Sequence, residues 1–458
     1  MRLEKDLLGD IEVPDGALWG AQTERARRLF GVSGQLVQPS LIRAGAEVKK
    51  ACARANAELG YLPAPVAGAI AAACDEVIAG QWADQFVTDA LQGGAGTSTN
   101  MNWNEVIAAR ATQLLGARVD PHDHVNLHQS TNDVYPTALR VAVLRGLAAL
   151  EPAVIRLTEA CQAKEREFAG VVKLGRTELR DAVPVTLGRE FGAWATALGR
   201  DRWRIAKCAE RIRETNLGGT AVGTGLAAPR DYIFLAIEKL REGSRLNLSR
   251  AENLMDATQN LDAFVEVSGI LRVHAVTLCK MARDLRLMGS GPEGGLGEIE
   301  LPALQPGSSL MPGKINPVLP EMVIQVAYRV MARDQEVCQV AMHGELELNA
   351  FMPLLADALL DMLRLLERTD VLFADSCVAG VRAYPERCRA LMERSREIVT
   401  ALIPKLGHAR AVELARAMAE SGQSVREAVL ARGWMTAAEL DDALSPERLC
   451  QLGWRKPG

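Results

Sequence analysis

The sequence lacks the features that mark several large classes of protein. Aromatic residues make up only 4% of its 458 residues, and the apolar weight lies in Ala, Leu, Val and Met, which suit helices better than pleated sheets. The 53 basic and 57 acidic residues leave a formal net charge of -4, so there is no excess positive charge for a nucleic acid or an anionic membrane surface. We therefore expect an all-α fold and no nucleic-acid partner.

Membrane spans, secretory signals and disulfide patterns are also missing. The longest candidate apolar run, Leu59–Cys74, is 16 residues long and contains Pro63 and Pro65, so it is too short and too interrupted to span a bilayer. The nine cysteines include no CxxC pair, and charged residues within the first six positions argue against a secretory signal. These features predict free thiols, a cytoplasmic location and no membrane partner.

Long stretches without proline predict long helices. Between Ala251 and Met288, apolar residues recur at alternating steps of three and four, as in a seam that packs against other helices. Similar periodicity covers 144–169, 190–217, Glu321–His343 and Pro353–Ala379. Five long helices predict a bundle. The shorter pieces around them divide the chain into an N-terminal helical domain at 1–130, a central helix-bundle domain at 131–388 and a small C-terminal helical domain at 389–458.

Four segments rich in small polar residues are the expected places for chemistry. The densest is Gln305–Glu321, QPGSSLMPGKINPVLPE, whose glycines and prolines predict a mobile loop that can close over an anion. Composition alone supports a plain surface loop equally well. The other three segments are Gly93–Glu105, Gln129–Pro136 and Gly175–Asp181. The first can present backbone N–H groups and hydroxyls to a carboxylate, whereas the serine and threonine of the second also suit ordinary helix capping.

The histidines offer one weak metal hypothesis. His122, His124 and His128 are closely spaced, but only His124 and His128 suit one helical face, and a third ligand is missing. We therefore predict no metal site. His274 lies inside the apolar seam and is interpreted as a packed core residue.

Together the polar segments resemble the fumarase/aspartase superfamily. GSSLMPGKIN is similar to the family's signature loop, GSSxMPxKxN, and GGAGTSTNMNWNE, HDHVNLHQSTNDVYPT, KLGRTELRDAVPVTLGREF, NLGGTAVGTGL and GSGPEGGLGEIE resemble other family segments in the same order. The two ends of the chain match the group that holds aspartate ammonia-lyase and class II fumarase. The resemblance implies a homotetramer whose central helices form one twenty-helix core, with each active site assembled from three subunits.

The resemblance also implies roles in an anti β-elimination that passes through a doubly charged aci-carboxylate. Ser308 matches the catalytic base, which acts as an alkoxide when the loop closes, and Lys314 and Asn316 match ligands of a substrate carboxylate. The remaining matches are Ser130 and Thr131 for the carboxylate that gains charge, Thr97 and Asn132 near the leaving group, Thr177 for a further carboxylate contact, and Glu321 for an acid that pairs with a histidine of the GRT segment. No metal or organic cofactor is implied.

The chain departs from the family pattern near these residues. Glu178 follows GRT where relatives usually carry His or Gln, and an ionised carboxylate can only accept hydrogen bonds. It is therefore protonated, turned away, or matched to a substrate that presents an amine. Arg180 replaces the usual Gln and can neutralise it, Glu293 replaces the usual Arg, and Ala227 replaces an Asn after GTGL. Two acids facing the site would favour a substrate with an additional cationic or amine group.

Three functions stay open at this point. QSTND, NPVLPE and LPALQPGSS resemble the ammonia-lyase versions and favour a carbon–nitrogen lyase that acts on L-aspartate or an N-substituted aspartate. NLGGTAVGTGL and the GxGE of GPEGGLGE lean to fumarase, which is the first alternative. The second is a non-catalytic bundle scaffold, and the intact Ser308, Lys314 and Asn316 argue against it.

Overall fold

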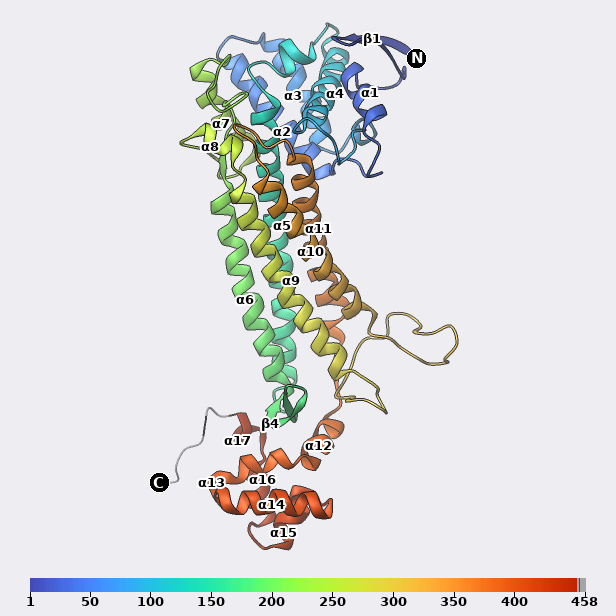
Figure 1. Cartoon of the computed structure of the whole chain (residues 1–458), viewed down its shortest axis with the longest axis vertical. Helices are drawn as coiled ribbons and strands as arrows, with labels where there is room; N and C mark the ends of the chain where they lie inside the picture. Colours follow the sequence, from blue (N-terminus) through green and yellow to red (C-terminus); the bar gives the residue numbers. More distant parts are fainter. Residues whose placement is uncertain (451–452, 454–458) are drawn as a thin grey trace. The chain divides into compact units, whose positions relative to one another are not determined.

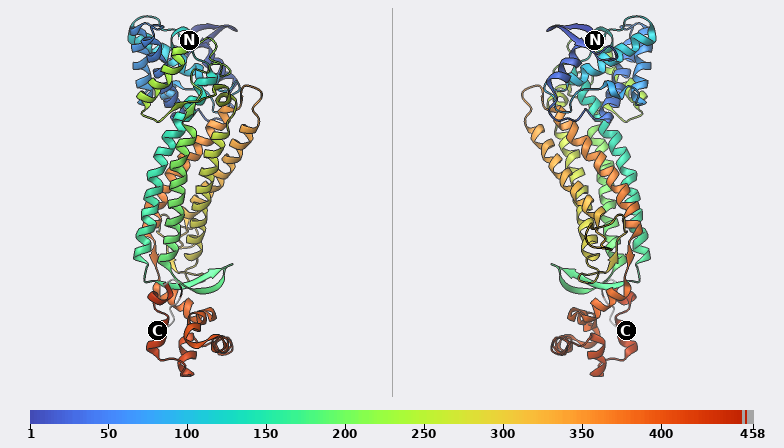
Figure 2. Two further views of the ribbon diagram at one scale, coloured as in Figure 1. Left: turned by 90° about the vertical axis from the view of Figure 1, so that its left-hand side faces the viewer. Right: turned by 90° about the vertical axis from the view of Figure 1, so that its right-hand side faces the viewer.

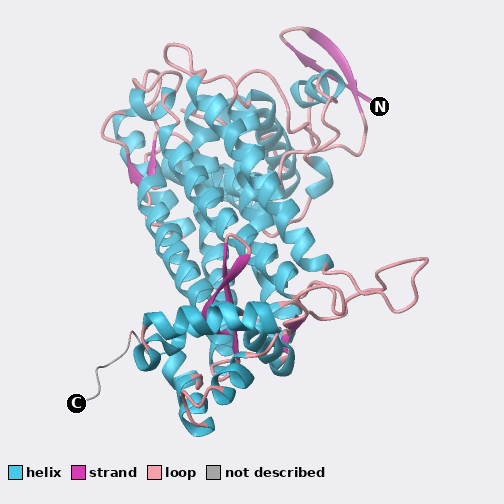
Figure 3. Ribbon diagram, turned by 60° about the horizontal axis from the view of Figure 1, so that its bottom comes forward, coloured by secondary structure: helices cyan, strands magenta, loops and turns pink. Residues whose placement is uncertain are grey.

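The part of the chain that the structure describes is mostly helical, as Figure 3 shows. The computed structural model describes residues 1–450 and Gly453. Within that part of the chain the strands form four two-stranded sheets: β1-β2, β3-β4 and β7-β8 are antiparallel, and β5-β6 is parallel. The predicted all-α class is therefore confirmed. No helix in the described residues is long and apolar enough to cross a membrane.

The elements follow one another along the chain, and Figure 1 labels those for which there is room. The helices are α1 (Ala21–Leu29), α2 (Pro39–Glu58), α3 (Ala64–Ile78), α4 (Thr97–Leu115), α5 (Thr131–Glu167), α6 (Leu187–Ile212), α7 (Arg230–Ser244), α8 (Leu254–Gln259), α9 (Asp262–Met288), α10 (Val318–Met342), α11 (Met352–Ser376), α12 (Pro385–Arg394), α13 (Ile403–Leu406), α14 (His408–Ser421), α15 (Val425–Ala431), α16 (Ala437–Ala443) and α17 (Pro446–Cys450). The strands are β1 (Arg2–Asp6), β2 (Gly9–Val13), β3 (Val172–Thr177), β4 (Arg180–Thr186), β5 (Glu214–Thr215), β6 (Ser249–Arg250), β7 (Ile299–Glu300) and β8 (Arg382–Ala383).

The chain folds into two compact units. Unit 1 contains Met1–Pro152, Trp203–Ala275 and Tyr328–Glu367, and unit 2 contains Ala153–Arg202, Val276–Ala327 and the described residues from Arg368 onward. The helices α5, α6, α9, α10 and α11 each contribute residues to both units. The three domains expected at 1–130, 131–388 and 389–458 describe order along the chain and stay a prediction.

The predicted apolar seam forms one buried face of α9. Its members are all 5% exposed or less: Phe264, Val267, Leu271, His274, Leu278, Met281, Leu285 and Met288. The predicted start at Ala251 was wrong, because the helix is interrupted at Asn260. Asn253 caps α8 by accepting the N–H groups of Met255 and Asp256, and the extended backbone of Asn260 ends that helix before α9 begins.

Two glycines in unit 1 let α4 pack closely against neighbouring helices. A Cβ on Gly45 would lie 2.1 Å from the Trp103 ring, so only glycine lets α2 approach α4 this closely. Gly96, with a φ of +93°, packs against Tyr135 of α5, where a Cβ would lie 2.4 Å from the tyrosine ring. The residue after Gly96 is Thr97, the first residue of α4. Its position is therefore set by a close backbone contact with α5.

In unit 2, the β3-β4 hairpin packs on the C-terminal helices. Leu174 of β3 is 2% exposed and belongs to the same apolar cluster as Met392, Leu402 and Leu414. Figure 2 shows the hairpin as an extended green ribbon that ends in a tip. The eight cysteines whose side chains are described are free thiols, as the sequence predicted, while the side chain of Cys450 lies outside the described part.

Candidate active site

A polar turn at the start of α5 carries three of the predicted site residues. Ser130 accepts a hydrogen bond at its Oγ from the Asn132 N–H at 3.2 Å, and Thr131 begins the helix. The Asn132 side-chain amide donates to the Ala221 carbonyl at 2.8 Å, while the Asn132 carbonyl accepts from the Asn216 amide at 2.9 Å. This Ser130–Asn132 turn is therefore tied to the loop at 216–225.

Thr97 also lies in unit 1, at the start of α4. Its side chain is exposed, and its Oγ1 donates to the Gly94 carbonyl at 2.8 Å. The N–H groups of a first helical turn lack partners within the helix and carry the positive end of its dipole. Thr97 therefore lies at a helix start whose N–H groups can interact with a carboxylate or a polar leaving group.

Beneath the turn lies a buried lysine among amide side chains. Lys49 is 0% exposed and donates at 2.9 Å to both Asn126 Oδ1 and Gln129 Oε1. Asn100 and Asn104 of α4 donate to the same Asn126 oxygen, at 3.2 and 3.1 Å. Burial lowers the pKa of Lys49 to about 8. These contacts fix the residues that directly precede Ser130.

Asp133, in the first turn of α5, is a second buried charge at this site. Its side chain is 0% exposed and accepts backbone N–H groups from Ser130 at 2.9 Å, Gly218 at 3.0 Å and Thr220 at 3.2 Å. Burial raises the pKa of Asp133 to about 6, and the three N–H donors and Lys49 oppose that rise. The carboxylate thus joins the turn to the 216–225 loop.

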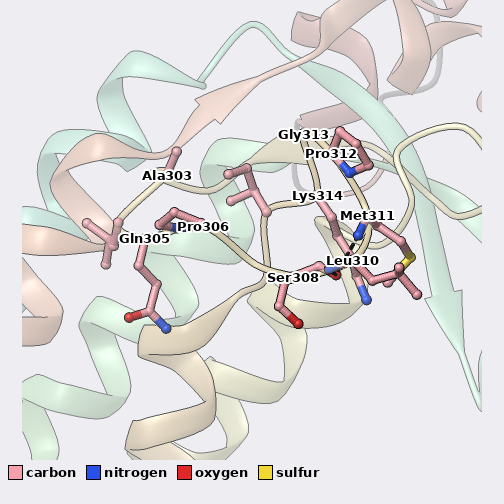
Figure 4. Close-up of a pocket in the computed structure, with 12 residues that line it drawn as sticks. Ala303, Gln305, Pro306, Ser308, Leu310, Met311, Pro312, Gly313 and Lys314 are labelled. Atoms are coloured by element: carbon pink, nitrogen blue, oxygen red, sulfur yellow. Dashed lines mark hydrogen bonds between the residues drawn. The ribbon is translucent and has the colours of Figure 1, made fainter.

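The signature loop in unit 2 connects β7 to α10 and carries Ser308, Lys314 and Asn316. Its neck is closed by the Gly307 N–H, which donates to the Lys314 carbonyl at 2.7 Å, and by the Asn316 amide, which donates to the Gly307 carbonyl at 2.6 Å. A cavity of about 600 Å³ is lined by residues between Ala303 and Ile315 (Figure 4). The three predicted residues therefore share one loop with its own internal hydrogen bonds.

Ser308 accepts two backbone hydrogen bonds at its hydroxyl oxygen. The donors are the N–H groups of Leu310 at 3.0 Å and Met311 at 2.8 Å. N–H groups aimed at one oxygen stabilise negative charge there. The Ser308 side chain is half-buried, while Lys314, on the same loop, is exposed (Figure 4). This environment suits an oxygen that carries negative charge during a reaction.

Thr177 and Glu178 lie at the tip of the β3-β4 hairpin. Glu178 and Leu179 form its two-residue turn with φ of +54° and +60°, the backbone signs of a type I′ turn. Both side chains of Thr177 and Glu178 are exposed. No ion pair joins Arg180 and Glu178 in the described residues, so the possible neutralisation of Glu178 by Arg180 is not seen. Glu293, the second unusual acid, is also exposed.

A buried cluster of charges anchors strand β3 of this hairpin. Glu298 is 0% exposed and lies 2.7 Å from Arg176 and 3.1 Å from Lys173, measured between carboxylate oxygen and side-chain nitrogen. Lys173 also donates to Glu190 at 2.8 Å. Arg176 directly precedes Thr177, so Glu298 holds the strand that carries it. Two acids and two cations leave the cluster electrically balanced.

Glu321 has a different partner from the one implied by the resemblance. With glutamate at 178 there is no histidine in the GRT segment, and Glu321 instead lies 3.4 Å from the Arg286 guanidinium, with both side chains partly exposed. Ala227, which replaces a family Asn, has a φ of +71°. Asn favours that left-handed conformation, so the usual Asn has a backbone reason at this position.

The structure groups the predicted residues by unit. Thr97, Ser130, Thr131 and Asn132 belong to unit 1, and Thr177, Glu178, Ser308, Lys314, Asn316 and Glu321 belong to unit 2. The sequence interpretation missed the buried supporting charges Lys49, Asp133 and Glu298. Two of them stand inside quoted motifs, QSTND and GLGE, so a charge within a motif of small residues was the available signal.

The closely spaced histidines have separate partners. His122 lies 3.2 Å from the Gln22 amide, His124 accepts the Asp120 N–H at 2.9 Å, and His128 lies 2.7 Å from Asn56 Oδ1. Across residues 1–450 and Gly453, no group of three or more His, Cys, Asp or Glu side chains is arranged to hold a metal ion.

Comparisons with known proteins place these features in context. Residues 9–332 match the Lyase family, and residues 398–451 match the fumarase C C-terminal family. Aspartate ammonia-lyase from Pseudomonas aeruginosa is 47% identical over 98% of this chain and 96% of its own length. A structure of fumarate lyase:delta crystallin from Brucella melitensis bound to cobalt is 49% identical with a TM-score of 0.95, covering 98% of this chain and 100% of that one. Class II fumarase from Schistosoma mansoni is 32% identical with a TM-score of 0.90, covering 97% and 98%.

Proposed function

The chain belongs to the lyase family that includes aspartate ammonia-lyases and class II fumarases, the fumarase/aspartase superfamily, and on this premise we propose that it is an aspartate ammonia-lyase. It eliminates ammonia, or an amine, from L-aspartate or an N-substituted aspartate and releases fumarate. The observation that carries the proposal is the higher identity to an aspartate ammonia-lyase than to a class II fumarase, in both cases over nearly the whole chain.

In the proposed reaction Ser308 is the base. As an alkoxide it takes a proton from C3 of aspartate, and its two backbone N–H donors support the negative oxygen that this step requires. The electrons of the C3–H bond pass through an aci-carboxylate and form the C2–C3 double bond as the C2–N bond breaks. The ammonium group leaves as ammonia, which finally takes up the proton released by Ser308.

The other predicted residues hold the substrate in this proposal. Lys314 supplies positive charge to one carboxylate, and Asn316 joins it if its amide leaves the Gly307 carbonyl. Ser130 and Thr131 hold the carboxylate that gains charge, and Thr97 and Asn132 lie near the leaving group. Thr177 gives a further carboxylate contact. Glu321 acts through Arg286 rather than through a histidine.

We propose that the active enzyme is a homotetramer with active sites shared between subunits. The support is a set of large apolar side chains that are exposed on the long helices: Val273 and Val276 on α9, Tyr328 and Met342 on α10, and Leu372 on α11. Exposed apolar surface of this kind is typical of association between chains. A cytoplasmic location and a reaction without metal or organic cofactor remain predictions from the sequence.

The test is an assay of purified protein with fumarate and ammonia, followed by a panel of primary amines and diamines, with products identified by mass. Consumption of fumarate with ammonia to give aspartate supports the proposal. Malate as the sole product would identify a fumarase, and no turnover of either substrate would favour a non-catalytic scaffold.

We propose a test of whether Glu178 selects the amine. Its exposed carboxylate has no ion-pair partner among the described residues. If it contacts the substrate, a Glu178→Gln variant loses turnover with diamines and gains turnover with ammonia. If ammonia turnover rises without any loss for diamines, the cationic-substrate idea is wrong.

A further inference from the structure

Asp133 accepts three hydrogen bonds from backbone N–H groups that belong to two separate segments. One oxygen accepts the Ser130 N–H, and the other accepts the N–H groups of Gly218 and Thr220. Gly218 has a φ of +87° and Thr220 a φ of +54°, so the loop backbone is bent to direct both N–H groups at one point. Such a concave set of N–H groups binds an anion, and here the anion is a side chain of the protein.

The same carboxylate lies beside the residues proposed to hold the substrate. Asn132 is bound on two sides by the loop, through its amide to the Ala221 carbonyl and through its carbonyl to the Asn216 amide. Ser130 is bound through its N–H to Asp133. The orientation of the Ser130–Asn132 turn therefore depends on how the 216–225 loop is fixed.

Joining two segments through a buried carboxylate that has no directly bonded cation costs free energy. Removing an ionised group from water costs several kcal/mol unless hydrogen bonds or opposite charge compensate. Unit 1 contains further carboxylates at 0% exposure, and one of them, Asp334, is compensated differently: it accepts the Ser268 hydroxyl and lies 2.6 Å from the Arg272 guanidinium. Asp334 is an ion-paired structural acid, whereas the donors of Asp133 are the backbone of the site itself.

We propose that Asp133 is a positioning residue for the elimination. Its carboxylate fixes the N–H groups of Gly218 and Thr220 and thereby sets the orientation in which Ser130, Thr131 and Asn132 meet the substrate. This inference rests on the proposed function, and it adds a residue that does not itself contact the substrate. Its effect passes through the geometry of the turn.

The test is Asp133→Asn, which keeps the shape and replaces one acceptor oxygen with an NH2 group that faces an N–H donor. Misplacement of a substrate-holding group by about 1 Å costs roughly 100-fold in rate, so we expect kcat/KM for aspartate to fall about 100-fold. We expect this loss to be divided between a lower kcat and a higher KM. A smaller folded fraction would lower only the apparent kcat, so the rise in KM distinguishes positioning from lost stability.

Two further variants keep the test decisive. Asp334→Asn makes the same change at a buried carboxylate that has an ion-pair partner, and its folded protein should keep the wild-type KM. Asn216→Ala removes the donor to the Asn132 carbonyl and should also raise KM, so it decides the matter if Asp133→Asn does not fold. Unchanged KM and kcat in folded Asp133→Asn, or in Asn216→Ala, would overturn the inference. If the wild-type protein does not turn over aspartate, it is the proposed function that fails.

Discussion

The two regions that carry the predicted site residues are held in opposite ways. In unit 1 the Ser130–Asn132 turn rests on buried polar groups, with Lys49 and Asp133 both 0% exposed beneath it. In unit 2 the signature loop holds Ser308 by hydrogen bonds within the loop, and Leu310 at its tip is 86% exposed. Buried polar groups therefore preorganise the turn, whereas the loop is held by hydrogen bonds between its own residues.

This difference matches the two tasks of the proposed reaction. Groups that meet developing charge gain most when they are already oriented, because no reorganisation is then needed during the reaction. A base that must reach a carbon-bound proton after the substrate enters can instead lie on a loop that moves. The same contrast predicts which substitutions will affect catalysis and which will affect folding.

The largest expected effect lies in the loop. Ser308→Ala removes the proposed base, and general-base catalysis contributes roughly 10²–10⁴-fold, so kcat should fall by about that factor. Folding should change little, because the side-chain hydrogen bonds that Ser308 makes with described residues stay within its own loop. Steady-state kinetics and thermal melting measure the two effects. Ser309→Ala, at the exposed neighbouring serine, is the control. An equal loss of kcat in that control would show that the loop, rather than the Ser308 hydroxyl, is responsible.

The next effect concerns stability in unit 2, where Glu298 contacts strand β3 of the hairpin. Glu298→Gln leaves Lys173 and Arg176 with Glu190 as the remaining acid, and removal of one partner from a buried ion pair costs about 3–5 kcal/mol. Urea unfolding at a fixed protein concentration should show that loss. The control is Glu300→Gln, because Glu300 is partly exposed and lies 3.8 Å from Arg382. Its loss should be at most about 1 kcal/mol. Equal losses in the two variants would show that Glu298 is not an anchor.

The sequence predicted the long helices well because their signal is local. The apolar residues of α9 recur with the helical period, and every one of them is buried as expected. The interruption at Asn260 was missed, since an asparagine is permitted within a helix and only the capping geometry of Asn253 reveals the break. The β3-β4 hairpin was also missed. Its turn uses Glu178 and Leu179 at positive φ, so none of the usual glycine or asparagine turn residues marks it.

The predicted site residues came from motifs. Motifs identify the residues that take part in the chemistry better than the buried residues that position them. Ser308 and Asn132 stand in segments whose roles came from the resemblance to family motifs, because composition alone also suited a surface loop or ordinary helix capping. Lys49, Asp133 and Glu298 are charged, and charged residues are mostly exposed, so their burial could not be read from the sequence. Their partners are distant in sequence: Gly218 binds Asp133 across 85 residues, and Arg176 binds Glu298 across 122.

A smaller effect separates the neck of the loop from its tip. A Cβ on Gly307 would lie 2.5 Å from the Lys314 carbonyl oxygen, so Gly307→Ala must open the neck. Misplacing Ser308 by about 1 Å would cost roughly 100-fold, and we expect kcat to fall by about 10- to 100-fold. The control is Gly313→Ala in the same loop, which has no atom within 4 Å of the added Cβ, although the φ of Gly313 is +78°. It should cost about 1 kcal/mol of backbone strain and little activity. Similar kinetics for both variants would show that the closed neck is irrelevant.

The smallest effect tests how Asp133 in the buried turn is compensated. Burial raises the pKa of Asp133 to about 6, above the ordinary value of 3.8. The folded state therefore binds this proton more readily than the unfolded state, and the free energy of unfolding decreases as pH rises through 6. Between pH 5 and pH 7 the wild type should lose about 1.4 kcal/mol more than Asp133→Asn, measured by urea unfolding at one protein concentration.

Glu24 provides the control, because its hydrogen bond to Arg27 holds the pKa of that carboxyl at about 2. Glu24→Gln should therefore follow the wild-type pH dependence over this range and depart from it only below about pH 4.5, where the wild type loses the stability that ionised Glu24 supplies. Parallel curves for the wild type and Asp133→Asn would mean that the backbone N–H groups compensate the ionised carboxylate fully. The buried turn would then lower the free energy of unfolding no more than the exposed loop does.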